Sequence, residues 1–292
     1  MPLEHVRTFC VRHNECNALG HVTDVNCLRY MEEAAFSASA AAGYDLARYE
    51  AMGRRWLIRE TDIEYLRPLR YGDSVEIKTW VADFRRVRSR RAYEFRLAGS
   101  GERVARASTD WVFVESATGR PATIPPEMIV AFFPEGLPET APPRVRMPAA
   151  SPPPPGVFKQ RRRVNWQDID PANHVNNSVY LAYVEDGGAQ ALAAHGWPLT
   201  RLWAEGLSIV ARRHQIEYLQ PALLDDELEL AAWALDVKRA SARCHTSITR
   251  VRDGTLLARV DSTYVWVDLV TQKPTRIPPA FLADFALHGV DG

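Results

Sequence analysis

The chain has 292 residues, 46% of them hydrophobic and 25% charged, and its formal net charge at pH 7 is +0. The length suggests about two domains, and the zero net charge argues against a general role at nucleic acids or membrane surfaces. The 4 cysteines form no CxxC pair, and the N-terminus lacks the apolar run of a signal peptide. No stretch reaches the roughly 20 apolar residues of a membrane span. We therefore expect a soluble, cytoplasmic protein.

Two copies of one sequence pattern follow each other at a constant offset of 153 residues, the difference between His174 and His21. The tetrapeptide IEYL at 63–66 returns at 216–219. The offset does not slip between about residue 11 and about residue 133. The sequence therefore predicts a duplicated fold, and each copy is long enough to bury a core.

We divide the chain into an N-terminal repeat at 1–133, a linker at 134–157 and a C-terminal repeat at 158–292. The linker is rich in proline, which cannot enter a sheet and favours extended polyproline geometry. Such a segment can carry the chain from the end of one copy to the start of the next. We therefore expect the repeats to pack as an internal pseudo-dimer; a flexible spacer between independent domains is the alternative.

The predicted elements have the same order in each copy. In the first copy we expect a strand at about 6–13, a helix at about 24–42, and strands at about 56–67, 73–84, 90–98 and 104–115. In the second we expect a strand at about 159–166, a helix at about 177–195, and strands at about 208–220, 226–237, 242–251 and 256–268. One helix followed by antiparallel strands is an α+β fold.

Each predicted helix is rich in small residues, so we expect its own sheet to wrap around it. Asp24 and Asn177 are the expected N-caps, and Gly43 and Gly196 suit the position after the C-cap. The helix start is important for function, because its unpaired N–H groups and its dipole favour negative charge.

One chemical difference separates the two loops that precede the helices. Position 170 is Asp, whereas its counterpart at position 17 is Asn. A carboxylate beside a helix start can act as base or nucleophile, while free N–H groups near Asn176 and Asn177 stabilise an oxyanion. The pattern predicts a working site in the second copy and a non-catalytic first copy.

The segment DIDPANHVNNSVYLAYVED at 168–186 resembles the motif DxDxxGxVxxxxYxxxxE of the 4-hydroxybenzoyl-CoA and YbgC-like thioesterases. Its HVNN is similar to the motif of plant acyl-ACP thioesterases, which are tandem hotdog proteins with the active residues in the second repeat. The resemblance implies a double hotdog fold and an enzyme, a thioester hydrolase that cleaves an acyl-CoA or acyl-ACP to a free acid and a thiol. It departs from the motif at Asn173, where the family has glycine. Ala172 and Pro221 stand where the plant enzymes have further site residues, so the bacterial single-aspartate chemistry is the better analogy.

The resemblance also implies the site residues. We expect Asp170, His174 and Asn177 to be catalytic, and Asp168 to be a structural partner of the loop. Because His21 takes the place of His174 in the first copy, a structural role is the alternative for His174. Since hotdog dimers build each site between copies, we expect substrate-binding residues from both repeats. These are Asn173, Asn176, Arg59, Glu60 and Thr61.

The expected partners are the acyl-CoA or acyl-ACP substrate and an acyl carrier protein, with no nucleic acid, membrane, cofactor or metal. The arginines of RRVRSRR at 85–91 can meet phosphates or an acidic carrier, although a solvated hairpin is the simpler interpretation. Two alternative functions stay open: a non-catalytic acyl-thioester binding or regulatory module, and a hotdog hydratase or dehydratase. We expect a monomeric pseudo-dimer, with or without further dimerisation.

Overall fold

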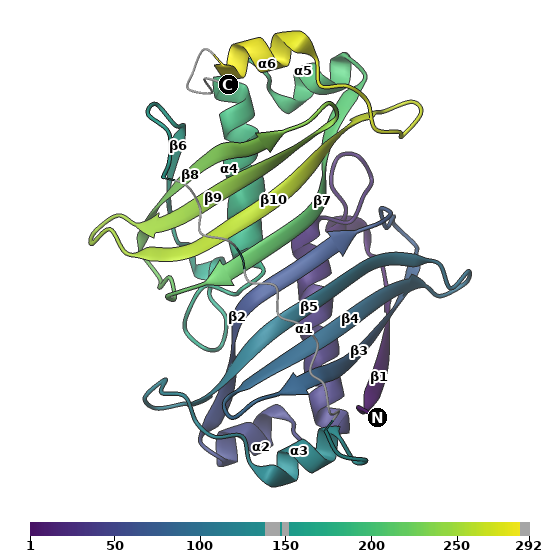
Figure 1. The fold of residues 1–292 in the computed structure, drawn as a ribbon, viewed down its shortest axis with the longest axis vertical. Helices are drawn as coiled ribbons and strands as arrows, with labels where there is room; N and C mark the ends of the chain where they lie inside the picture. Colours follow the sequence, from purple (N-terminus) through teal and green to yellow (C-terminus); the bar gives the residue numbers. More distant parts are fainter. Residues whose placement is uncertain (138–146, 148–151, 287–292) are drawn as a thin grey trace. The chain divides into compact units, whose positions relative to one another are not determined.

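The computed structural model describes residues 1–137, 147 and 152–286. The chain divides into two compact units, Met1–Arg146 and Met147–Gly292 (Figure 1). Most of the expected linker, residues 138–146 and 148–151, lies outside the described residues.

The first unit is an antiparallel sheet with one long helix. Its strands lie in the order β1-β3-β4-β5-β2. They span β1 (Glu4–Cys10), β2 (Arg54–Tyr65), β3 (Ser74–Phe84), β4 (Arg88–Leu97) and β5 (Arg103–Glu115). The helices are α1 (Asp24–Ala41), α2 (Leu46–Ala51) and α3 (Pro126–Phe132).

The second unit repeats the first, element for element. Its strands lie in the order β7-β10-β9-β8-β6. They span β6 (Lys159–Arg163), β7 (Leu207–Tyr218), β8 (Glu227–Val237), β9 (Ser241–Arg250) and β10 (Leu256–Asp268). The helices are α4 (Val179–Ala194), α5 (Leu199–Ala204) and α6 (Pro279–Ala286). The expected α+β fold is confirmed, with strand bounds within three residues of the predicted ones.

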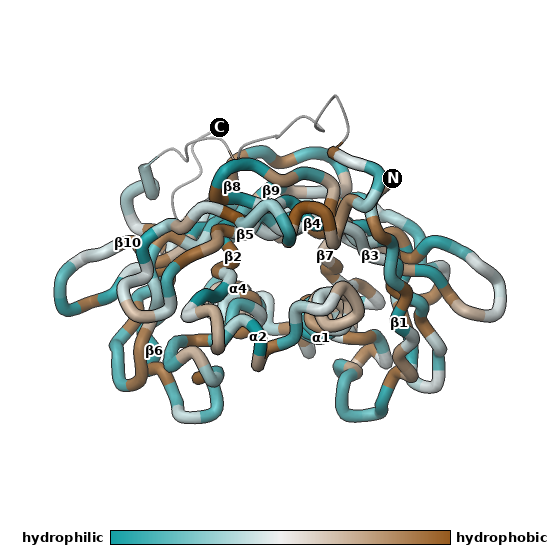
Figure 2. The backbone as a smooth tube through the Cα atoms, turned by 90° about the horizontal axis from the view of Figure 1, so that it is seen from below, coloured by the Kyte–Doolittle hydropathy of each residue, from teal (hydrophilic) through white to brown (hydrophobic). Residues whose placement is uncertain are grey.

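Each long helix lies beneath the sheet of its own unit (Figure 2). The buried face of α1 includes Leu28, Met31, Ala35 and Ala38, three or four residues apart, as one face of a helix requires. This face contacts β1 and β3. Burying Leu28 alone is worth about 1.5–3 kcal/mol of unfolding free energy, and the small residues let the sheet approach the helix closely.

The ends of the long helices show one confirmed and one wrong prediction. Gly43 and Gly196 have φ of 81° and 78° and follow the C-caps. The N–H of Gly43 donates to Ala40 at 2.9 Å, one of the two bonds of a Schellman cap. The expected N-caps are wrong by one residue, because Thr23 caps α1 and Ser178 precedes α4.

The four short helices were not predicted. In the first unit, α2 and α3 contribute to an aromatic and aliphatic cluster centred on Tyr49, Phe113, Met128 and Phe132. In the second, α5 and α6 contribute to the corresponding cluster around Trp197 and Leu202. Helices of six to eight residues are marginal alone, so packing in these clusters explains why they form.

The edge-to-edge pairing of the two sheets stays a prediction. Within its own unit, β2 is an edge strand of 12 residues, and a long unpaired edge promotes aggregation. We expect a fragment of residues 1–137 to aggregate or self-associate on size-exclusion chromatography, whereas the full chain does not. A soluble monomeric fragment with a cooperative thermal melt would show that the repeat does not need a partner.

Candidate active site

The loop before α4 is a short turn that backbone hydrogen bonds hold together. It follows a 3-10 helix, η2 (Trp166–Asp168), and an isolated bridge joins Ile169 to Val175. The N–H of Asp170 donates to the carbonyl of His174 at 3.0 Å, and the N–H of Asn173 donates back to the carbonyl of Asp170 at 2.9 Å. The backbone of Asp170 is therefore fixed by two hydrogen bonds.

Asn173 occupies the position that glycine takes in the resembling motif. Its φ is 61°, in the left-handed region, and the equivalent Gly20 has a φ of 73°. Glycine adopts this conformation freely, and asparagine tolerates it better than most other residues. The departure from the motif therefore preserves the turn.

Asp168 ties this loop to the long helix. Its carbonyl accepts the N–H of Asn176 at 2.9 Å. Its buried carboxylate accepts the N–H of Asn165 and the hydroxyl of Tyr183, each at 2.8 Å. Burial, followed by the bond to Asp168, raises the pKa of Tyr183. These contacts agree with a structural role for Asp168.

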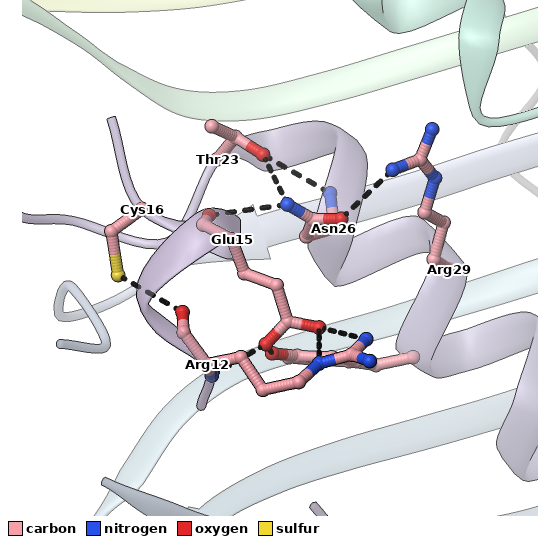
Figure 3. Close-up of polar contacts among 7 residues, drawn as sticks. Arg12, Glu15, Cys16, Thr23, Asn26 and Arg29 are labelled. Atoms are coloured by element: carbon pink, nitrogen blue, oxygen red, sulfur yellow. Dashed lines mark hydrogen bonds and ion pairs between the residues drawn. The ribbon is translucent and has the colours of Figure 1, made fainter. Parts of the chain in front are cut away.

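The first repeat has the same connection between loop and helix, in the loop after η1 (His13–Glu15) (Figure 3). The carbonyl of Glu15 accepts the N–H of Thr23 at 3.0 Å. Its carboxylate accepts the N–H of Arg12 at 2.7 Å and the hydroxyl of Tyr30. Asn26 adds a side-chain bond to the Glu15 carbonyl at 3.1 Å. An acid and a tyrosine 15 residues apart thus hold the loop in both repeats.

Asp170 is partly exposed and only partly bonded. Its side chain is 17% exposed, and one oxygen, Oδ1, accepts the N–H of Ala172 at 2.8 Å. The same Oδ1 lies 3.7 Å from Nδ1 of His174. Within the described chain, Oδ2 accepts no hydrogen bond. That oxygen can therefore approach a water molecule or an acyl carbon.

Only one of the two expected backbone donors is available. The N–H of Asn176 is bonded to Asp168, so the expectation that it stabilises an oxyanion is wrong. The N–H of Asn177 has no acceptor among the described residues. The Asn176 carbonyl of the same peptide accepts from Val179 at 2.9 Å. Because the N–H and C=O of a trans peptide point in opposite directions, the Asn177 N–H points away from α4.

The Asn176 side chain has its own structural role. Its Oδ1 accepts the N–H of Ser178 at 2.9 Å and the hydroxyl of Ser178 at 2.7 Å. The hydroxyl of Tyr218 on β7 donates to the Asn177 carbonyl at 3.0 Å. The peptides at the helix start are thus held from both sides, and the roles of Asn173, Asn176 and Asn177 toward a substrate stay predictions.

Asn17 occupies the place of Asp170 in the first repeat. Its N–H donates to the His21 carbonyl at 2.8 Å, and its side-chain oxygen accepts the N–H of Leu19 at 3.0 Å. Burial and the neighbouring Arg70 lower the pKa of His21. The two loops therefore share one geometry and differ in the charge of one side chain.

The remaining expected residues lie on β2. Thr61 is buried, while Arg59 and Glu60 are half-buried. Arg59 is the extra residue of a β-bulge against β5, and bulges reorient side chains locally. Since β2 belongs to the first unit, a contribution of Arg59, Glu60 and Thr61 to the Asp170 site stays a prediction.

Parts of the arginine run are already paired. Arg85 contacts Asp83 at 3.0 Å, and Arg90 contacts Asp110 at 2.6 Å. Within the described residues, no group of three or more His, Cys, Asp or Glu side chains could hold a metal ion. No helix in that part of the chain combines the length and the apolar character needed to cross a bilayer.

Comparison with known proteins agrees with this geometry. A model of the family described as the "Thioesterase-like superfamily" matches residues 11–132 and 164–285, one match in each repeat. The acyl-CoA thioester hydrolase YbgC of Escherichia coli is 30% identical over 129 residues, which are 44% of this chain and 96% of the relative. The acyl-[acyl-carrier-protein] hydrolase FATB2 of Cuphea viscosissima is 25% identical over 187 residues, 61% of this chain and 45% of the relative.

A solved structure shows the fold. The 12:0-ACP thioesterase from Umbellularia californica superposes with a TM-score of 0.73 at 20% identity and covers 89% of this chain and 93% of its own. At that identity the likeness concerns the fold alone, which is the double hotdog that the sequence predicted.

The turn predicts a contrast between two substitutions of Asn173. Asn173→Ala places a Cβ-bearing residue with little αL tolerance at a φ of 61°, so we expect it to lower the free energy of unfolding by about 1 kcal/mol. Asn173→Gly should leave that free energy within about 0.5 kcal/mol of the wild-type value. Urea unfolding of both variants checks this, and equal losses would mean that the backbone conformation is not the constraint.

Proposed function

Because the chain belongs to the thioesterase-like superfamily, we propose that it hydrolyses an acyl-CoA or acyl-ACP thioester through Asp170 of the second repeat. The contrast between two loops of one geometry is the main support for this role of Asp170. The carboxylate stands in the second loop and the neutral amide of Asn17 in the first. We infer that the first repeat is non-catalytic.

The substrate class follows from chemistry that the relatives share. YbgC is named for acyl-CoA and FATB2 for the acyl carrier protein. CoA and the carrier present the acyl group on the same kind of pantetheine thiol, so one site can serve either carrier. The substrate we propose is an acyl group in thioester linkage to such an arm.

Asp170 supplies the attack in one of two ways. As a base, its Oδ2 takes a proton from water while the water oxygen bonds to the acyl carbon; the tetrahedral intermediate then expels the thiolate, which is protonated to the thiol. As a nucleophile, the carboxylate forms an anhydride and releases the thiolate, and water then cleaves the anhydride to the free acid. Both routes need a negative charge at position 170.

The Asn177 N–H stabilises the oxyanion in both routes. It points out of the start of α4, where the helix dipole favours negative charge. His174 lies beside the carboxylate, with its Nδ1 3.7 Å from Oδ1 and 3.4 Å from the Val175 carbonyl. The turn bonds keep base and donor on one short loop.

We expect Asp170→Asn to lower kcat by about 10²-fold or more, the scale of losing a general base. The fold should survive, because Asn17 makes the equivalent turn in the first repeat. Thiol release from an acyl-CoA measures kcat, and circular dichroism checks the fold. Asn17→Asp, the reverse change in the matching loop, is the control and should leave kcat unchanged; near wild-type turnover by the Asp170→Asn variant would remove Asp170 from the mechanism.

A second variant tests whether the first repeat lacks only its acid. In an Asp170→Asn background, Asn17→Asp should recover less than roughly a tenth of the wild-type kcat/KM, a deficit of at least about 1.4 kcal/mol in transition-state stabilisation. The reason is Asp24, the first residue of α1, whose charge opposes an oxyanion where the second repeat has neutral Asn177. Recovery to near the wild-type value would show that one substitution alone silenced the first repeat.

A further inference from the structure

Arg91 is a buried cation on the inner face of the first repeat. Along β4, alternate side chains are buried, and Arg91 belongs to the buried set together with Ser89, Tyr93 and Phe95. It is 7% exposed. Arginine is rarely this buried unless an acid pairs with it.

The contacts of the Arg91 guanidinium are few and weak. One nitrogen lies 3.4 Å from Oγ1 of Thr79, and the guanidinium carbon lies 5.7 Å from the ring centre of Phe132. In the described part of the chain, no carboxylate lies within 4.0 Å of it. The next residue, Arg90, forms two bonds to Asp110, at 3.2 and 2.6 Å.

The neighbours of Arg91 do not balance its charge. Burial, followed by Arg91 itself, lowers the pKa of His5, which keeps this ring neutral near pH 7; its Nε2 lies 2.9 Å from the Ser37 hydroxyl. Burial raises the pKa of Tyr93 to about 12, so this phenol is neutral as well. Burial lowers the pKa of Arg91, but a guanidinium starts so far above neutrality that it stays protonated. An uncompensated charge in such surroundings is unfavourable.

The fold does not require an arginine at this place. At the offset of 153 residues, Cys244 takes the position of Arg91 and Ala232 that of Thr79. Burial raises the pKa of the Cys244 thiol to about 12, so the equivalent place in the second repeat also disfavours charge. The second repeat has the same order of elements without a cation there, which suggests that Arg91 serves a ligand.

We propose that Arg91 makes the interior of the first repeat a binding site for the carboxylate of an acid with an apolar body. The planar N–H fork of a guanidinium matches the two oxygens of a carboxylate. Beside it lies Phe132, part of the buried apolar cluster of Tyr49, Phe84 and Phe113, so an apolar body bound at Arg91 would lie against apolar side chains. A phosphate dianion fits less well, because a single cation would leave one of its charges uncompensated in an apolar region. The proposal goes beyond hydrolysis at the second repeat and does not depend on Asp170.

Isothermal titration of the full chain with octanoate and with neutral octanamide tests the site. We expect octanoate to bind at least about 10-fold more tightly than octanamide, the scale of a charge-assisted bond pair. Arg91→Met should remove that preference. Arg88→Met is the matched control, since Arg88 is exposed at the start of the same strand, and it should retain the preference.

Thermal unfolding separates a ligand site from a structural arginine. Without ligand, Arg91→Met should melt at or above the wild-type temperature, because it replaces an unpaired buried charge by an apolar group of similar length. If Arg91→Met does not fold, Arg91→Lys keeps the charge without the fork, and we expect it to weaken octanoate binding about 10-fold. Equal binding of octanoate and octanamide to the wild type, or an undiminished preference in either Arg91 variant, would overturn the proposal.

The carboxylate can belong to a free acid or to the far end of an acyl group. The ratio of kcat/KM for suberyl-CoA to that for octanoyl-CoA distinguishes these sources, since suberyl-CoA carries a terminal carboxylate. The ligand that we propose is the free acid, for which Arg91→Met leaves the ratio unchanged. A fall in the ratio would assign the carboxylate site to the far end of the substrate's acyl group. An equal loss of both kcat/KM values, together with unchanged octanoate binding, would contradict a carboxylate site at Arg91.

Discussion

The connection between loop and helix is the constraint on which the candidate site depends. In both repeats an acid before the helix accepts a backbone N–H and a tyrosine hydroxyl 15 residues later, and its carbonyl accepts an N–H at the helix start. These bonds hold residues 168–176 against α4. Removing Asp168 would leave the buried Tyr183 hydroxyl without its acceptor, an unfavourable change. Asp170, the catalytic acid that we propose, lies two residues away on the same held loop.

Duplication lets one repeat change while the other keeps its chemistry. The backbone bonds around position 170 recur around position 17, so replacing Asp by Asn there alters charge without altering the turn. Arg91 is the opposite case, a charged residue in the first repeat whose counterpart in the second is the uncharged Cys244. Each repeat thus has its own buried or half-buried charged group, set in a common framework of α helix and antiparallel sheet.

Much of the framework could be predicted from the sequence, because it depends on periodic patterns. The constant offset gave the duplication, alternating apolar residues gave the strands, and Gly43 and Gly196 gave the helix ends. The short helices were missed because packing around residues such as Phe113 and Trp197 stabilises them rather than local propensity. The bond between Asn176 and Asp168 depends on how the loop folds back on itself, so no sequence signal shows that this N–H is occupied. Arg91 looked like one more arginine of a solvated hairpin, since burial depends on the register of β4.

We infer that the double hotdog is an enzyme rather than a module that only binds acyl thioesters. The most direct measurement is thiol release by the full chain from a panel of aliphatic and aromatic acyl-CoAs, with the free acid quantified in parallel. For an enzyme we expect catalytic release of thiol and acid in equal amounts from at least one member of the panel. Saturable binding of these acyl-CoAs with no thiol released above the uncatalysed rate would contradict it.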